Sequence, residues 1–419
     1  MNALLTAMRG NMRQYGMIIA LVAIGILFQI LTGGLLLKPQ NVSNLILQNS
    51  YVFILAIGMM LVIITGHIDL SVGSVAAFVG AVAAVLMVNQ GWSTIPTIIA
   101  ALAIGALVGV WQGFWIAYMR IPSFIVTLAG MLIFRGLTLT LTDGKAIAPF
   151  PEDFRAIATS FIRDFAGGST LTTIILGVAV SVFLVVSELR GRARRAKYGL
   201  PLIPMGLFVA RLVLLVAAIN AFTVLLAQRN GLPTAGLIVI VLVVVYSYVM
   251  SRTVLGRHVY AVGGNEKAAL LSGVRTQRVT FLVFVNMGVL SAIAGLIVTA
   301  RLNAAGPRAG TNFELDAIAA AFIGGASAAG GVGTVVGAII GAMVMGIMTN
   351  GMQIIGIEVD WQSTIKGLVL LAAVFFDVYS KNKSGKTSFF VKIFKRQPKD
   401  EPDSVLKRTS SGSGEKVGI

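Results

Sequence analysis

The chain has 419 residues, of which 57% are hydrophobic and 12% are charged, and its mean hydropathy is +0.89. So few charges cannot cover the surface of a soluble globule of this length, which excludes an ordinary soluble domain. The absence of cysteine excludes disulfides and thiolate metal sites. The net charge of +17 comes from basic residues at the ends of apolar runs and in the tail. This distribution indicates membrane topology and no nucleic-acid partner.

Long apolar runs without ten-residue alternation predict an all-α fold, a polytopic transmembrane helical bundle with about 10–12 membrane segments. Several of the runs are short enough to be broken or re-entrant. The predicted segments are 17–37, 50–66, 74–89, 95–118, 121–141, 171–189, 205–226, 232–250, 280–300, 315–329, 332–353 and 361–379.

The first apolar run, Met17–Leu37, is expected to stay as the first helix, because no convincing small-residue cleavage site follows it. With the N-terminus inside, the inner segments collect 23 Lys and Arg residues and the outer loops collect seven. This asymmetry follows the positive-inside rule and predicts that both termini are cytoplasmic. The expected parts are a cytoplasmic N-terminal segment 1–16, a transmembrane domain 17–379 and a cytoplasmic tail 380–419.

The segment Gly66–Gly73, with the sequence GHIDLSVG, interrupts two apolar runs. Asp69 is costly in hydrocarbon unless it faces water, a helix end or a partner. Asp69 or Ser71 capping the next helix is one interpretation, and a place on a substrate path is the other. The histidine of this segment, His67, and His258 are isolated, so no metal site is expected.

The segment Ile121–Leu128 carries Pro122, which suits the first turn of a helix because its missing N–H is not needed there. Arg135 lies within the apolar run that follows. It is expected to reach an interface or to pair internally, as a structural anchor.

The polar loop 251–278 separates two long apolar runs. Within it, Asn265 suits a helix N-cap and Gly273 a helix end, which predicts a short helix over Glu266–Ser272. A helix of two turns needs a surface to pack on. A solvated loop with a nascent helix is the alternative.

Small residues dominate the second half of this loop and allow close docking of a partner. The residues expected at that contact are Gly263, Gly264, Asn265, Glu266, Ala268, Ala269, Ser272 and Gly273.

The segment Leu315–Ala320, with the sequence LDAIAA, precedes a glycine-rich stretch. Gly333, Gly337 and Gly341 recur every four residues and fall on one helical face. This stripe predicts close packing against another helix backbone.

Four separated motifs resemble the permease subunits of bacterial ribose/xylose-type (multiple monosaccharide) ABC importers, in the family's order. They are the GHIDLSVG segment, IPSFIVTL at 121–128, the loop with YAVGGN at 260–265 and SGV at 272–274, and LDAIAA with the glycines after it. The resemblance covers roughly 41–379. In that family the loop equivalent to 251–278 is where a separate ATPase subunit presses.

The resemblance implies a homodimeric permease in the bacterial inner membrane that imports a monosaccharide, xylose or another pentose or hexose. It further implies a cytoplasmic ABC ATPase, which would hold ATP and Mg²⁺, and a periplasmic sugar-binding protein. No cofactor and no enzymatic activity are expected in this chain. Gly385-Lys386-Thr387 resembles the end of a phosphate-binding loop, but the first glycine of such a loop and a preceding strand are both missing, so ATP hydrolysis by this chain is not expected.

Polar side chains within the spans are candidates for the translocation path: Asp69, Ser71, Asn286, Asn303 and Asn350. Each also suits a buried hydrogen bond between helices.

An ion-coupled secondary transporter is a competing function, although the ionisable groups lie mostly near predicted span ends. Nucleosides, autoinducers and branched-chain amino acids are alternative solutes.

The tail after 380 is expected to be disordered, and its aromatic and basic residues indicate a contact with membrane lipid or a simple charged tail.

Overall fold

The computed structural model describes residues 12–162, 170–200, 202 and 204–384, and the expected terminal segments fall largely outside this part. Its contacts group the chain into two units, Met1–Asp377 and Val378–Ile419, and the description below concerns the first. The regular secondary structure of the described residues is helical, apart from the isolated bridges of Ile147 with Ala305 and Phe161 with Pro233. The predicted all-α class is confirmed.

In the described part, nine helices are long and apolar enough to cross a membrane. These are α3 (Pro39–Ile64), α4 (Val72–Ala84) with its π-helical end η1 (Val85–Asn89), α5 (Thr94–Ala117), α6 (Ser123–Thr142), α8 (Thr170–Lys197), α9 (Met205–Ala227), α10 (Thr234–Arg252), α13 (Thr276–Leu302) and α15 (Val335–Ile354). The remaining helices are α2 (Met12–Leu31), α7 (Glu152–Thr159), α11 (Val254–Gly264), α12 (Glu266–Leu271), α14 (Phe313–Ile323) and α16 (Val359–Ser384).

The predicted span 315–329 does not cross as a helix. Its helical part is α14, which ends at Ile323 after 11 residues. At 1.5 Å per residue this helix is about 16 Å long, roughly half of the hydrocarbon thickness. Gly325 and Gly330 have positive φ values of 81° and 78°, so the chain turns away there. α14 is therefore a half-helix inside the bundle.

Two other predicted boundaries shift. The first predicted helix, 17–37, ends earlier, at Leu31, because the chain turns through Gly33 and Gly34, both with positive φ. The predicted span 50–66 is the second part of α3, which begins at Pro39 in the favoured first-turn position for proline.

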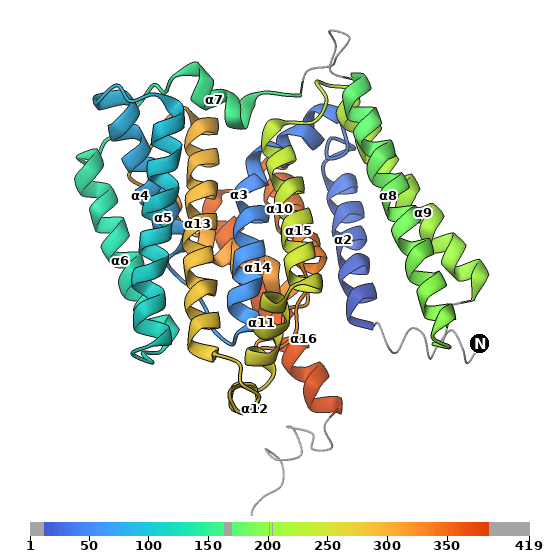
Figure 1. Cartoon of the computed structure of the whole chain (residues 1–419). Helices are drawn as coiled ribbons and strands as arrows, with labels where there is room; N and C mark the ends of the chain where they lie inside the picture. Colours follow the sequence, from blue (N-terminus) through green and yellow to red (C-terminus); the bar gives the residue numbers. More distant parts are fainter. Residues whose placement is uncertain (1–11, 163–169, 201, 203, 385–419) are drawn as a thin grey trace, which may run out of the picture. The chain divides into compact units, whose positions relative to one another are not determined.

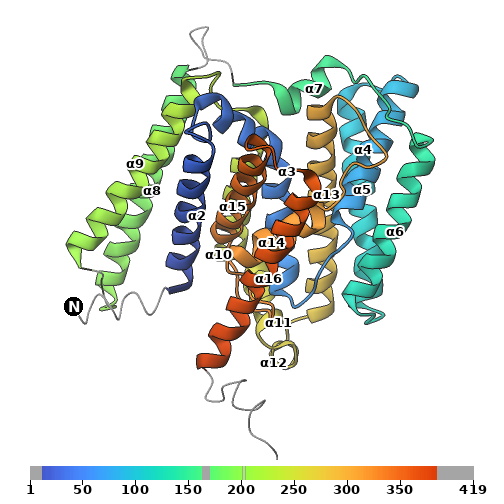
Figure 2. The ribbon, with the colours of Figure 1, turned by 180° about the vertical axis from the view of Figure 1, so that it is seen from behind.

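The centre of the bundle is formed by α3 and α13, with α4 and α5 on one side and α10, α14 and α15 on the other (Figures 1 and 2). Of the most apolar stretch of α3, 83% is buried. Backbones meet directly where α5 crosses α13: a Cβ on Gly288 would lie 2.2 Å from the carbonyl oxygen of Gly105. Dispersion contacts between backbones this close stabilise the helix pair in lipid, where the hydrophobic effect does not drive helices together.

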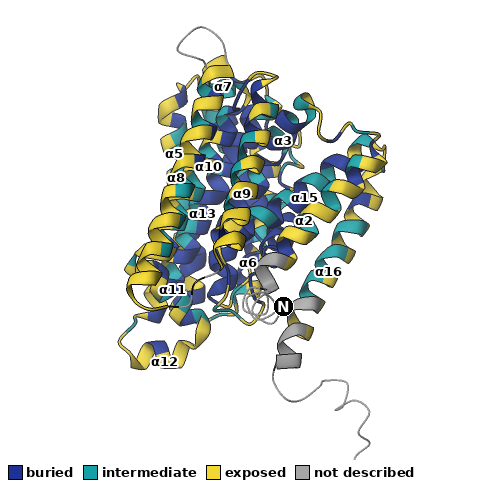
Figure 3. Cartoon of the chain, turned by 90° about the vertical axis from the view of Figure 1, so that its right-hand side faces the viewer, coloured by how far each residue is buried: buried dark blue, intermediate teal, exposed yellow. Residues whose placement is uncertain are grey.

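The hairpin of α8 and α9 lies at the edge and exposes most of its apolar surface (Figure 3). The two helices are joined by Asn220, whose amide donates to the hydroxyl of Ser181 at 2.9 Å, and by close contact of Gly177 with Thr223. Such an apolar exterior suits contact with lipid.

The connections of the first unit gather at two ends. α12, the α5–α6 turn and the start of α2 lie at one end, and α7 lies at the other (Figure 1). This arrangement agrees with the predicted alternation of sides. Which end faces the cytoplasm stays a prediction that rests on the charge asymmetry.

Candidate coupling junction and solute pocket

The loop predicted to receive a partner contains two helices. Asn265 caps α12, since its Oδ1 accepts a hydrogen bond from the backbone N–H of Ala268 at 3.0 Å, and Gly273 follows with a φ of 84°. The expected short helix is thus present and ends one residue earlier. The preceding helix α11 was not predicted; its signal was Thr253, whose Oγ1 accepts from the backbone N–H of Gly256 at 3.3 Å.

Most of the predicted contact residues in this loop are accessible. Ala269 is buried and Gly263 is half-buried, whereas the exposed residues are Gly264, Asn265, Glu266, Ala268, Ser272 and Gly273. Leu271 is 89% exposed at the end of α12. An apolar side chain this exposed on a two-turn helix provides a surface for a partner.

The end of α11 contacts the protein interior through backbone atoms at one place, which we call the coupling junction: Tyr260–Gly264, Ile64 at the end of α3, and 330–333. A Cβ on Gly263 would lie 1.6 Å from the carbonyl oxygen of Ile64, so only glycine fits. That same carbonyl accepts from the backbone N–H of Gly331 at 2.8 Å.

Tyr260 completes the junction, because its hydroxyl donates to the carbonyl oxygen of Gly333 at 2.7 Å. Burial raises the pKa of the Tyr260 hydroxyl, which keeps it protonated as a donor. The packing glycine Gly333 therefore lies at the junction, where its Cβ would be 2.9 Å from the side chain of Ile64.

The residues after the half-helix α14 connect the junction to α15. A Cβ on Gly337 would lie 2.1 Å from the carbonyl oxygen of Gly324, and one on Gly341 would lie 1.9 Å from that of Ala320. The predicted glycine stripe thus brings the backbones of α14 and α15 into contact. These backbone contacts place α14 directly against the start of α15, next to the junction.

The other end of α14 is held by charge. Asp316 pairs with Lys366 of α16 at 2.9 Å and accepts a hydrogen bond from the hydroxyl of Tyr51 on α3 at 3.0 Å. The exposed fractions of the two charged side chains are 6% for Asp316 and 20% for Lys366. No local pattern predicts this pair, because its members are 50 residues apart and on separate helices.

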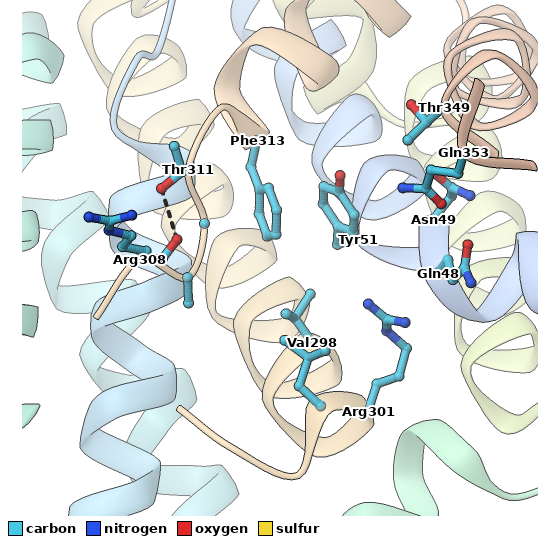
Figure 4. A pocket seen from close by; sticks show the side chains of 13 residues that line it. Gln48, Asn49, Tyr51, Val298, Arg301, Arg308, Thr311, Phe313, Thr349 and Gln353 are labelled. Carbon is cyan, nitrogen blue, oxygen red and sulfur yellow. Dashed lines mark hydrogen bonds between the residues drawn. The ribbon is translucent and has the colours of Figure 1, made fainter. Parts of the chain in front are cut away.

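A pocket of about 410 Å³ opens beside this end of α14, within the usual range of about 300–1,000 Å³ for small-molecule sites (Figure 4). It lies between α3, α13, the connection from α13 to α14, and α15. Its lining comprises Gln48, Asn49, Tyr51, Val298, Arg301, Leu302, Arg308, Ala309, Gly310, Thr311, Phe313, Thr349 and Gln353. These residues are scattered over some 300 positions, so no local motif predicted the pocket.

Two of the predicted path residues, Asp69 and Ser71, are buried in a polar cluster outside this pocket. Oδ1 of Asp69 accepts from both the backbone N–H and the hydroxyl of Ser71, at 2.8 and 2.7 Å. Gln112 of α5 donates to the Ser71 hydroxyl at 2.7 Å. This cluster holds the break between α3 and α4 against α5.

The three predicted asparagines also hydrogen-bond within the chain. Asn286 accepts from the hydroxyl of Tyr246, Asn303 accepts from the backbone N–H of Phe150 at 2.8 Å, and Asn350 exchanges two hydrogen bonds with Asn41 at 2.7 and 3.1 Å. None of the predicted path residues lines the pocket.

Comparison with known proteins decides the family. Residues 41–374 match the branched-chain amino acid transport system / permease component family. The chain belongs to this family of transport permeases. Together with the apolar helices, this membership makes it a multi-pass inner-membrane protein and a transport component.

Individual family members match nearly full length. The xylose transport system permease protein XylH of Haemophilus influenzae is 41% identical over 89% of this chain and 98% of that protein. XylH of Escherichia coli K12 is 42% identical over 89% and 94%. The ribose import permease protein RbsC of Bacillus subtilis is 33% identical over 88% and 94%. No solved structure gives a significant match.

Proposed function

We propose that this chain is the permease subunit of an ATP-driven importer of a monosaccharide, with xylose as the first candidate. The observation that carries the proposal is its 41–42% identity to permeases named for xylose transport, over nearly their whole length. The permeases named for ribose import are 33–35% identical.

The proposed assembly contains two copies of this chain, an ABC ATPase subunit on the cytoplasmic side and a periplasmic sugar-binding protein. ATP and Mg²⁺ are held by the ATPase, and this chain holds no cofactor. Both termini are cytoplasmic in this arrangement, which agrees with the 23 to seven distribution of basic residues.

The contact for the ATPase is proposed at α11 and α12, because the exposed residues of α12 include Leu270 and Leu271. A push on α11 reaches α3 and the 330–333 segment through the junction. From there it reaches α14, whose first residue, Phe313, lines the pocket. The cycle of ATP binding and hydrolysis would thereby move α14, and with it the side of the pocket that Phe313 forms.

The predicted path through Asp69, Ser71, Asn286, Asn303 and Asn350 remains a proposal. In the described conformation each of these side chains has a hydrogen-bond partner in the chain. Passage of a sugar along them requires that these bonds exchange for bonds to sugar hydroxyls.

The test is uptake of D-xylose into proteoliposomes that contain this chain with its neighbouring-gene ATPase and binding protein. We expect uptake that requires both the binding protein and ATP on the side of the ATPase. Ribose and leucine are added in turn to measure whether they compete with xylose. Uptake driven by an ion gradient without the ATPase would identify a secondary transporter instead. Import of leucine but not xylose would overturn the proposed solute.

A further inference from the structure

Arg301 has an unusual environment in the pocket. It lies in the last turn of α13, where the helix dipole favours a positive charge, and its side chain is half-buried. Within the described part of the chain, its guanidinium has no ion-pair or hydrogen-bond partner, in contrast to Arg211, which pairs with Glu188. The helix end accounts for the charge but leaves the N–H donors of Arg301 for another acceptor.

Amide and hydroxyl groups face Arg301 across the pocket (Figure 4). Among the described residues, the side-chain amides of Gln48 on α3 and Gln353 on α15 have no protein partner. The hydroxyl of Thr349 donates to the carbonyl of Met345 at 2.9 Å and keeps its lone pairs for an external donor. The pocket therefore offers both donors and acceptors, as the hydroxyl groups of a polyol require.

An aromatic wall completes the pocket. The rings of Tyr51 and Phe313 stack with centroids 3.8 Å apart. Tyr51 is fixed by its bond to Asp316, and Phe313 is fixed as the first residue of α14. Because the two rings cover one face of each other, the surface that they leave to a solute consists of the outer faces and the ring edges. An apolar surface of this kind beside polar groups suits a sugar ring, which is apolar on its faces and polar at its edge.

Two cationic side chains, Arg301 and Arg308, line the cavity, and no carboxylate does. The nearby carboxylates do not balance them, because Asp316 already pairs with Lys366 and the cation that acts on Glu314 is Arg135. The charge of the pocket therefore does not select a neutral solute over an anion. The neutral class follows from the proposed function, and the acid of the same sugar is the alternative that the experiment tests.

We propose that this pocket binds one neutral monosaccharide, a pentose or hexose, within a single copy of the chain. Arg301, Gln48 and Gln353 hydrogen-bond the sugar hydroxyls, and Tyr51 with Phe313 forms the wall for the ring. This proposal rests on the proposed function, because the ligand is the transported solute. It adds a site that α14 links to the coupling junction.

The test uses the absence of cysteine from the chain. Two pocket positions are converted separately, Thr349→Cys and Ala309→Cys, and the rate of maleimide labelling is measured in nanodiscs with and without D-xylose. Arg229→Cys, at the α9–α10 turn and outside the pocket, is the control. We expect xylose to slow labelling at both pocket positions and to leave the control unchanged.

A second variant assigns the protection to Arg301. Arg301→Met in the Ala309→Cys background keeps the side-chain length and removes the donors. It should raise the xylose concentration for half-protection by about tenfold or more, since a hydrogen bond to a charged group contributes about 1.5–3 kcal/mol. Gel filtration and the unchanged labelling rate without sugar show that the variant folds.

The outcomes separate this proposal from the proposed function. If the complete complex imports xylose but neither pocket cysteine is protected, the pocket site is wrong and the import function stands. Protection by D-xylonate and not by xylose would also overturn it, in favour of an anion site. If the complex imports no monosaccharide, the proposed function fails whatever the labelling shows.

Discussion

Lys366 of α16 and Asp316 of α14 form an ion pair at 2.9 Å, and Asp316 is 94% shielded from solvent. Lys366→Met would leave that carboxylate buried without a cation. We expect a loss of about 3–5 kcal/mol in the free energy of unfolding, because removing one partner of a buried pair leaves an uncompensated charge. Thermal unfolding in detergent measures this loss.

The double variant Asp316→Asn with Lys366→Met is the matched control for this pair, because it removes both charges and keeps an acceptor for the Tyr51 hydroxyl. Replacing both charges with neutral groups should restore most of the stability. A single Lys366→Met variant that unfolds at the wild-type temperature would show that the pair does not hold α14.

Gly263 and Gly264 provide a paired test of the coupling junction. An added Cβ at Gly263 would meet the carbonyl oxygen of Ile64 at 1.6 Å, whereas one at Gly264 would meet nothing within 4 Å. Gly263→Ala is therefore expected to abolish ATP-dependent uptake, and Gly264→Ala to retain it. A bulky residue at Gly264 should abolish uptake by blocking the exposed contact surface. Equal uptake by the two alanine variants would contradict this assignment.

Asp69 is expected to act as an acceptor that holds the α3–α4 break. Asp69→Ala leaves the backbone N–H of Ser71 without its acceptor, at a cost of about 1–3 kcal/mol in stability. Asp69→Asn keeps an oxygen for that bond and should unfold close to the wild-type temperature. If both variants retain stability but lose transport, Asp69 acts on the solute path.

Asn41 and Asn350 exchange hydrogen bonds between α3 and α15. A double-mutant cycle with Asn41→Ala and Asn350→Ala should give a coupling energy of about 0.6–2 kcal/mol, the range for polar pairs between membrane helices. The cycle is measured by unfolding in detergent. Additive losses would indicate that the two amides act independently.

Topology can be measured directly because the chain has no cysteine. Single variants Arg229→Cys and Gly306→Cys are expected to react with an impermeant reagent in intact spheroplasts, and Lys267→Cys only after the membrane is opened. Reaction of Lys267→Cys in intact spheroplasts would place α12 outside and reverse the orientation.

Local rules predicted those features that depend on neighbouring residues. Asn265 and Gly273 marked the two ends of α12 because capping acts within one turn. The stripe of Gly337 and Gly341 marked a close helix contact for the same reason, since residues four apart share a face.

Features that depend on residues far apart in the sequence were not predicted. The half-helix α14 was predicted as part of a span, since a hydropathy profile does not detect the turns at Gly325 and Gly330. The pocket and the Asp316–Lys366 pair were not predicted because their members come from separate helices that only tertiary packing brings together. The asparagines chosen as path candidates proved to be hydrogen-bonded to other side chains or to the backbone, and a single sequence does not distinguish such residues from those that contact a solute.

The coupling junction consists largely of backbone against backbone, with Gly263 and Gly331 both meeting the carbonyl of Ile64. Side chains adjust to small movements by changing rotamer, whereas a planar peptide group moves only through the φ and ψ angles beside it. No side-chain rearrangement can therefore relieve a movement of Gly263 toward the carbonyl oxygen of Ile64. Under the proposed function, a shift of α11 on binding of the ATPase should displace the end of α3 in the same step.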